Sequence, residues 1–184
     1  KVVTNDPKGV GSFLMASNEM DIAAKQPIGQ GKTVMLDSYF NNEMKKDANG
    51  QMVSWHYKWD ELPNSGFSLW GNVFRSYGAK TETLREAPTA TNLKGSSIYI
   101  IVDPDTPTET EKPNYVESKD VKAIADWVKG GGVLVLMGND VGNAEFDHFN
   151  QLAGAFGIQF NKDSRNKVPG NDFTMGRLIV TPPH

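Results

Sequence analysis

The turn at residues 138–142, Gly-Asn-Asp-Val-Gly, has the glycine spacing of a nucleophile elbow, with Asp140 at the position of the nucleophile. An apolar run precedes the turn and a helical pattern follows it, as such an elbow requires. In the functional interpretation, a sharp turn presents Asp140 as a carboxylate nucleophile for carbon–halogen or phosphoryl chemistry. In the simpler interpretation, which we favour, the glycines relieve backbone strain in an ordinary strand–helix turn.

Three further aspartates, Asp37, Asp103 and Asp105, stand like Asp140 where a predicted strand ends. Converging carboxylates can bind Mg²⁺ or Ca²⁺. Aspartate is also common in turns and caps, so the Asp-Pro-Asp stretch at residues 103–105 is better interpreted as a turn. Asp37 and Asp103 remain candidates for substrate contact, and we predict no metal ion and no cofactor.

The bases available to such carboxylates are the three histidines, His56, His148 and His184. Glu145 and His148 lie three residues apart in a helical pattern, which is half of the motif of a carboxylate-bridged di-metal site. No second Glu-x-x-His occurs in the sequence. We therefore interpret this pair as part of a solvated helix face.

Aromatic side chains are concentrated at residues 55–59, where Trp55, His56, Tyr57 and Trp59 stand close together. In a loop, they could form a stacking platform for a sugar ring or a base. In a hairpin strand, alternate residues would instead pack on one side and be buried. Packing is the interpretation we favour, and the four side chains remain candidates for substrate binding.

The segments that position these residues alternate between strand and helix patterns. Helical spacing predicts helices with Ser65 and Ser118 as N-caps. Such alternation indicates an α/β fold with a parallel sheet and helices on both faces, in which function lies at the carboxyl ends of the strands. The predicted strands are residues 33–36, 80–84, 97–102, 133–137, 158–160 and 177–180, and the predicted helices are residues 65–77, 118–129 and 145–156.

Composition excludes several classes of protein. None of the 184 residues is cysteine, which excludes disulfides, thiolate metal sites and cysteine nucleophiles. The net charge of -3 provides no basic field for nucleic acid or anionic lipid. No apolar run approaches the ~20 residues of a membrane span, and neither glycine-rich phosphate-binding motif occurs. We therefore expect no nucleic-acid, nucleotide or membrane partner.

The start of the chain has a pattern of its own. An Asp-Pro pair at residues 6–7 is typical of a helix start, and Phe13 and Leu14 continue at helical spacing. A single amphipathic helix is marginal in water, so we expect it to be disordered or to pack on a neighbouring molecule. We therefore divide the chain into a helix at 1–24, a proline- and glycine-containing linker at 25–31 and an α/β domain at 32–184.

Two stretches of the sequence resemble known families. Residues 6–20 (Asp-Pro-Lys-Gly-Val-Gly-Ser-Phe-Leu-Met-Ala-Ser-Asn-Glu-Met) resemble the last helix of the (α/α)6 catalytic barrel of unsaturated rhamnogalacturonyl hydrolases, of the glycoside hydrolase family 105 and 88 type. The remainder resembles the class I glutamine amidotransferase-like domain that some Bacteroidetes members carry after the barrel. The residues that carry this second resemblance are 36–43, 100–106, 141–150 and the helix–glycine–strand step at 127–135.

This resemblance implies a three-layer, flavodoxin-like domain joined to the terminal helix of an upstream barrel, and a domain that continues past residue 184. The catalytic aspartate of those hydrolases lies in the barrel, so no catalytic residue carries over. The elbow cysteine of the amidotransferase superfamily corresponds best to Asp140. Because the chain has no cysteine, glutaminase chemistry is excluded.

The function implied is that of a non-catalytic accessory domain in a periplasmic or secreted enzyme that degrades pectin or rhamnogalacturonan and acts on unsaturated uronyl oligosaccharides. Its role would be carbohydrate contact, lid formation or assembly. The implied partners are the upstream catalytic barrel of the same polypeptide, an oligosaccharide and, in an assembly role, a second copy of the chain. Two alternatives stay open: an independent hydrolase that uses Asp140 with Asp37, Asp103 or His56, and a pure oligomerisation module.

Overall fold

The computed structural model describes residues 20, 27–63, 65–139 and 141–163 of the chain. Some predictions lie outside these residues. They are the helix at 1–24 apart from Met20, the first residues of the linker, the Asp140 carboxylate of the turn and the strand at 177–180. Among the helices that the structure describes, none is long and apolar enough to cross a membrane.

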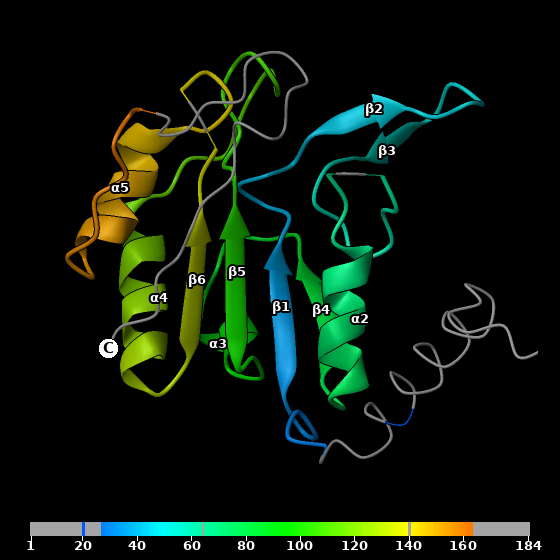
Figure 1. Cartoon of the computed structure of the whole chain (residues 1–184). Helices are drawn as coiled ribbons and strands as arrows, with labels where there is room; N and C mark the ends of the chain where they lie inside the picture. The colour runs from blue at the N-terminus through cyan, green and yellow to red at the C-terminus, as the bar shows by residue number, and fades with distance from the viewer. Residues whose placement is uncertain (1–19, 21–26, 64, 140, 164–184) are drawn as a thin grey trace, which may run out of the picture.

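A parallel sheet forms the centre of the structure (Figure 1). Its four strands stand in the order β4-β1-β5-β6, and every neighbouring pair is parallel. Each of them was predicted, because runs such as Ile-Tyr-Ile-Ile-Val are apolar on both faces, as a sheet covered on both sides requires. The strands are β1 (Thr33–Asp37), β4 (Lys80–Leu84), β5 (Ile98–Val102) and β6 (Val133–Met137).

Helices cover both faces of this sheet, so the structure has three layers (Figure 1). Alternation along β1 directs Val34 and Leu36 to the face that α2 covers, and Met35 to the face of α4 and α5. The α/β class and a flavodoxin-like arrangement are thereby confirmed. The helices are α2 (Ser68–Ser76), α3 (Ala90–Leu93), α4 (Ser118–Lys129) and α5 (Phe146–Gly154).

The strand order also indicates where a ligand would bind. Along the chain, the next strand of this sheet, β4, pairs on one side of β1, and the strand of the sheet that follows, β5, pairs on the other side. The next helix after β1 lies on one face of the sheet, whereas the helix after β5 lies on the opposite face. Open α/β sheets bind ligands beside such a switch point, at the carboxyl ends of the two adjacent strands. Here these are the ends of β1 and β5, next to Asp37 and Asp103.

An antiparallel hairpin of β2 (Met44–Lys46) and β3 (Met52–Ser54) stands beyond the carboxyl ends of the sheet (Figure 1). The aromatic residues that follow do not continue β3 as an alternating strand. The φ angles of His56 and Tyr57 are 58° and 50°, in the left-handed region that a strand cannot use. The hairpin-strand interpretation of residues 55–59 is therefore wrong, and the segment is a turning loop.

The ends of several elements differ from the sequence prediction. Ser65 does not cap α2, because Phe67 holds the N-cap position and the Ser65 hydroxyl donates to Glu61. The N-cap of α4 is Glu117 rather than Ser118, in a capping box with Asp120. Side-chain competition of this kind is local and is not visible in hydrophobic spacing.

The predicted strand at residues 158–160 is also wrong. The amide of Ile158 donates to Ala153 at the end of α5, and the amide and carbonyl of Phe160 both bond to the Asn150 side chain. These contacts fold the segment back onto α5, where the Phe160 ring stacks on Phe149. The apolar residues of this segment therefore pack on a helix instead of joining the sheet.

A cavity of about 850 Å³ opens at the amino ends of the strands. Apolar side chains such as Phe74, Ile98 and Trp127 line it, and Val73 and Val133 at its border are 51% and 53% exposed. This cavity lies at the end of the sheet opposite to Asp37 and Asp103. It is therefore separate from the site that the strand order indicates.

Candidate functional site

The carboxylate of Asp37 organises the loop that follows β1. Its Oδ2 accepts hydrogen bonds from the amides of Tyr39, Phe40 and Asn41, at 3.3, 2.9 and 3.1 Å. Its Oδ1 accepts from the Tyr99 hydroxyl of the neighbouring strand at 2.8 Å. Burial raises the pKa of Asp37 to about 6, although these donors oppose the increase. Asp37 is 1% exposed, so it shapes the site from beneath and cannot touch a ligand.

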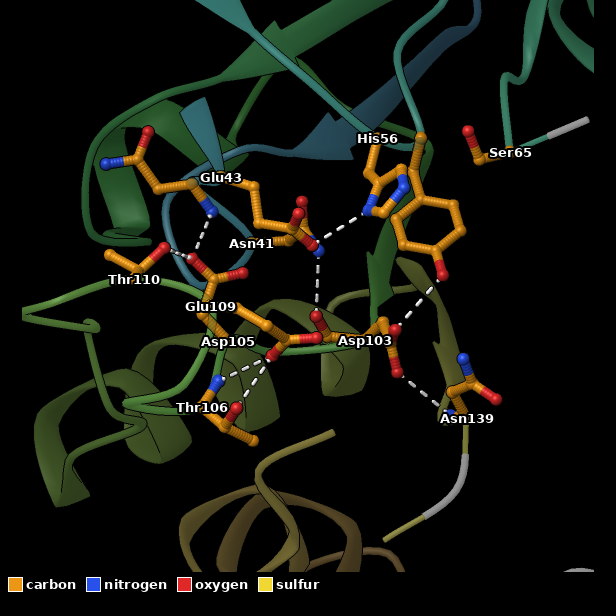
Figure 2. A network of polar contacts seen from close by, with 12 residues as sticks. Asn41, Glu43, His56, Ser65, Asp103, Asp105, Thr106, Glu109, Thr110 and Asn139 are labelled. Carbon is orange, nitrogen blue, oxygen red and sulfur yellow. Dashed lines mark hydrogen bonds and ion pairs between the residues drawn. The ribbon is translucent and has the colours of Figure 1, made fainter. Parts of the chain in front are cut away.

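Asp103 holds the loop that follows β5. Its φ of 48° places a non-glycine residue in the left-handed region. Its Oδ2 accepts from the Tyr57 hydroxyl at 3.0 Å, and its Oδ1 accepts from the Asn139 amide at 3.0 Å. Its main-chain carbonyl accepts from the Asn41 side chain at 2.8 Å. Asp103 therefore connects the loops after β1, β3, β5 and β6 (Figure 2).

Two further carboxylates, those of Asp105 and Glu109, lie in the same loop after β5. Asp105 Oδ2 accepts from the Asn42 amide at 2.9 Å and from the Thr110 hydroxyl. Glu109 accepts from both the amide and the hydroxyl of Thr106, at 2.9 and 2.8 Å. Burial is the main cause that raises the pKa values of Asp105 and Glu109.

Two buried acceptors at this site have no donor among the residues that the structure describes. They are Oδ1 of Asp105 and Oδ1 of Asn41, and both residues are 1% exposed. A buried polar atom without a partner costs about 1–3 kcal/mol. Such costs are uncommon in native interiors and tend to accompany functional sites.

Glu43 and His56 form a hydrogen-bonded pair above this network (Figure 2). The distance from His56 Nδ1 to Glu43 Oε1 is 2.9 Å, and the two side chains are 24% and 7% exposed. A buried carboxylate on Nδ1 fixes the ring orientation, and the partly exposed ring keeps its other nitrogen for a further hydrogen bond. The geometry can therefore supply a positioned imidazole, which is a base or a hydrogen-bonding group for a ligand.

Backbone strain is concentrated here. Among the described residues, the non-glycine residues with positive φ are His56, Tyr57 and Asp103, and all three belong to this one cluster. A non-glycine residue held in this region costs on the order of 1–3 kcal/mol and persists only where its surroundings enforce it. Such strain is typical of ligand-binding and catalytic sites, which supports the choice of this edge as the candidate site.

The aromatic candidates separate into two groups. Trp55 is half-buried and stacks on His56 with ring centroids 3.5 Å apart, and Lys45 Nζ lies 4.9 Å from its ring centroid. Trp59 instead packs among the rings of α2, and its indole nitrogen donates to the carbonyl of Glu82 at 2.9 Å. Tyr57 packs in the same cluster, with its hydroxyl directed to Asp103. Trp55 and His56 are thus at the rim, whereas Tyr57 and Trp59 support it.

The glycine-flanked turn after β6 contributes Asn139, whose amide bonds to Asp103, whereas Asp140 lies outside the described residues. Glu145 is the N-cap of α5 and accepts from the amides of Asp147 and His148. The Glu145 and His148 pair is therefore part of a helix cap. No group of three or more His, Cys, Asp or Glu side chains in the described part of the chain could hold a metal ion.

Several residues of the site were not singled out from the sequence. They include Asn41, Glu43, Lys58 and Glu109, which occupy long loops far apart in the chain. The one available signal was the high density of Asn and Glu shortly after the first strand, at residues 41–43.

No protein-family model matches the chain, and neither a curated protein nor a solved structure matches it. The geometry of this edge of the sheet is therefore the basis for a functional proposal.

Proposed function

We propose that this chain is a non-catalytic accessory domain that contacts carbohydrate through the loops at the carboxyl edge of its sheet. In this proposal it belongs to a periplasmic or secreted glycoside hydrolase that acts on unsaturated uronyl oligosaccharides of pectin or rhamnogalacturonan. Its partner in the same polypeptide is the upstream catalytic barrel. The observation that carries the proposal is that the carboxylates at the strand ends accept hydrogen bonds from the loops around them.

Each of those carboxylates accepts internal hydrogen bonds on at least one of its oxygens. Asp37 accepts four of them and is buried, and Asp103 accepts one on each of its oxygens. Asp105 and Glu109 are tied to the amides and hydroxyls of their own loops and of the loop after β1. A nucleophile or general base must reach the reacting atom. Carboxylates that hold loops in place suit a binding surface better than a catalytic centre.

The rim of the site has the chemistry that sugars require. The half-buried Trp55 ring, stacked on His56, provides an apolar face for the C–H side of a sugar ring. His56 and Lys45 lie next to this ring and can bond to hydroxyl groups. His56 sits on a backbone that the strained network holds in place, which lowers the cost of ordering the loop on binding.

Calorimetric titration with pectin-derived oligosaccharides tests this proposal. Trp55→Ala should weaken binding by about tenfold, the scale of one aromatic stacking contact. Tyr115→Ala is a matched control, because Tyr115 also stacks on a histidine, with ring centroids 4.5 Å apart, but lies on the α5 side. Binding that is absent, or that both variants weaken equally, would contradict carbohydrate contact at this rim. Sedimentation of the same samples tests the alternative of a pure oligomerisation module.

The hydrogen-bonded pair of Glu43 and His56 favours one other candidate, an independent hydrolase. The paired imidazole would act as the general base that takes the proton of an attacking water molecule, either in direct hydrolysis of a substrate or in hydrolysis of an ester intermediate formed on the Asp140 carboxylate. Turnover of uronyl oligosaccharides or generic esters that is lost in His56→Gln and Glu43→Gln would favour this candidate over the binding domain.

A further inference from the structure

A second cavity lies beside the candidate site, at the carboxyl end of β4. Its volume is about 350 Å³. Ligand pockets commonly span about 300–1,000 Å³, so this cavity suits a small ligand such as a single sugar unit. Thr83 and Arg85 line it from the end of β4, and Ser54 lines it from the end of β3. Lys58 and Asp60 line it from the loop between β3 and α2.

Among the residues that the structure describes, no acidic side chain is in hydrogen-bond contact with either cation of this cavity, Lys58 or Arg85. Lys58 is 8% exposed, and its Nζ donates to Ser38 Oγ at 3.1 Å and to the Asn41 carbonyl at 3.4 Å, both of which are neutral groups. The exposed Arg85 side chain forms no hydrogen bond or ion pair with any described residue. A buried ammonium is costly unless an anion compensates it. The cavity therefore has positive charge available for a ligand.

The charges around Lys58 support this interpretation. Burial lowers the pKa of Lys58, and the positive charge of Arg85 adds to that decrease. Asp37, Asp105 and Glu43 oppose it from the neighbouring network, without reaching hydrogen-bond contact. An anion bound between Lys58 and Arg85 would offset the positive charge of Arg85. The pKa of Lys58 would then rise, and its ammonium would stay charged.

We propose that this cavity binds the carboxylate of an acidic sugar unit, with Arg85 and Lys58 on the carboxylate. The hydroxyls of Ser54 and Thr83 and the carboxylate of Asp60 then bond to the hydroxyl groups of the ring. Asp60 disfavours a phosphate, which carries more negative charge than a carboxylate. This inference rests on the proposed carbohydrate contact and specifies the chemical class of the ligand.

Calorimetric titration with three probes tests it: glucuronate, glucose and glucose 6-phosphate. We expect glucuronate to bind at least tenfold more tightly than glucose. Arg85→Gln should remove about tenfold of the glucuronate affinity, which is the scale of a hydrogen bond between charged groups. Lys80→Gln is the matched control, since Lys80 is an exposed cation at the opposite end of the same strand, and it should leave the affinity unchanged. Glucuronate binding should also weaken as the pH rises and Lys58 loses its proton.

Each other result overturns the inference in a recognisable way. Equal affinity for glucose and glucuronate would exclude an acidic sugar while leaving carbohydrate contact intact. Tighter binding of glucose 6-phosphate would replace the carboxylate with a phosphate as the ligand group. Loss of affinity in both Arg85→Gln and Lys80→Gln would indicate a non-specific charge effect. Failure of all three probes, together with oligosaccharide binding that Trp55→Ala weakens, would overturn this cavity alone and not the proposed function.

Discussion

Asp37 offers the sharpest test of how the candidate site is built, because its carboxylate is buried and its pKa is raised from 3.8 to about 6. A raised pKa means that the folded protein favours the neutral acid more than the unfolded chain does. The stabilisation is fully present below pH 3.8 and is lost as the pH rises through about 6. At about 1.4 kcal/mol per pKa unit, the contribution lost between these pH values is about 3 kcal/mol.

Two variants separate the charge of Asp37 from its hydrogen bonds. In Asp37→Asn, the amide oxygen can still accept from the three loop amides, but no proton is gained or lost. This variant should be more stable than the wild type at pH 7, by at most about 3 kcal/mol, and the difference should shrink toward pH 4. In Tyr99→Phe, the carboxylate loses its hydroxyl donor, so stability at pH 7 should fall by about 1.5–3 kcal/mol.

Urea unfolding followed by tryptophan fluorescence at a series of pH values between 4 and 7.5 provides the measurement. The quantity to compare is the difference in unfolding free energy between wild type and Asp37→Asn, because other titrating groups cancel in it. A difference that does not change with pH, or a wild type that gains on the variant as the pH rises, would refute the reasoning. The first result would mean that the hydrogen bonds to Asp37 balance its desolvation, and the second that they outweigh it.

The remaining predictions concern packing and local structure. Gly66→Ala should destabilise the fold by at least about 1–3 kcal/mol, because the new Cβ would lie 1.8 Å from the Glu61 carbonyl oxygen. Gly154→Ala, in α5 with open space around it, should instead gain about 0.5–1 kcal/mol; thermal unfolding of both variants checks the contrast. Phe149→Ala removes a fully buried ring and should cost about 3–5 kcal/mol in urea unfolding. Thr89→Ala removes the N-cap side chain of α3 and should cost about 0.5–2 kcal/mol, with faster amide exchange confined to that turn.

The sheet and its covering helices could be predicted because their signals are local. The four strands are short apolar runs, and the longer helices α2, α4 and α5 have their apolar residues at helical spacing. The four-residue α3 was not predicted, since a single turn with a Thr89 cap has almost no periodicity. The segment at 158–160 was predicted to be a strand because its apolar residues look the same whether they pair with a strand or pack on a helix.

The candidate site was predicted in part. Asp37 and Asp103 were identified because aspartates at strand ends are visible in the sequence, and parallel strands bring their carboxyl ends to one edge. Whether such a carboxylate faces a ligand or holds a loop depends on donors that arrive from elsewhere, such as the Tyr99 hydroxyl and the Asn139 amide. The Glu43 and His56 pair also joins residues 13 positions apart across a hairpin, a separation without any periodic signal.

The sequence by itself determined the α/β class, the elements of the sheet and the edge at which polar residues collect, because these follow from hydrophobic spacing and from turn-forming residues. The tertiary structure alone decided which carboxylates accept hydrogen bonds from the loops, which aromatic rings reach the rim and which described cations have no acidic group in contact. These outcomes depend on contacts between residues distant in the chain. At the Lys58 and Arg85 cavity, no acidic side chain of the described residues is in hydrogen-bond contact with either cation, and no local sequence pattern records this.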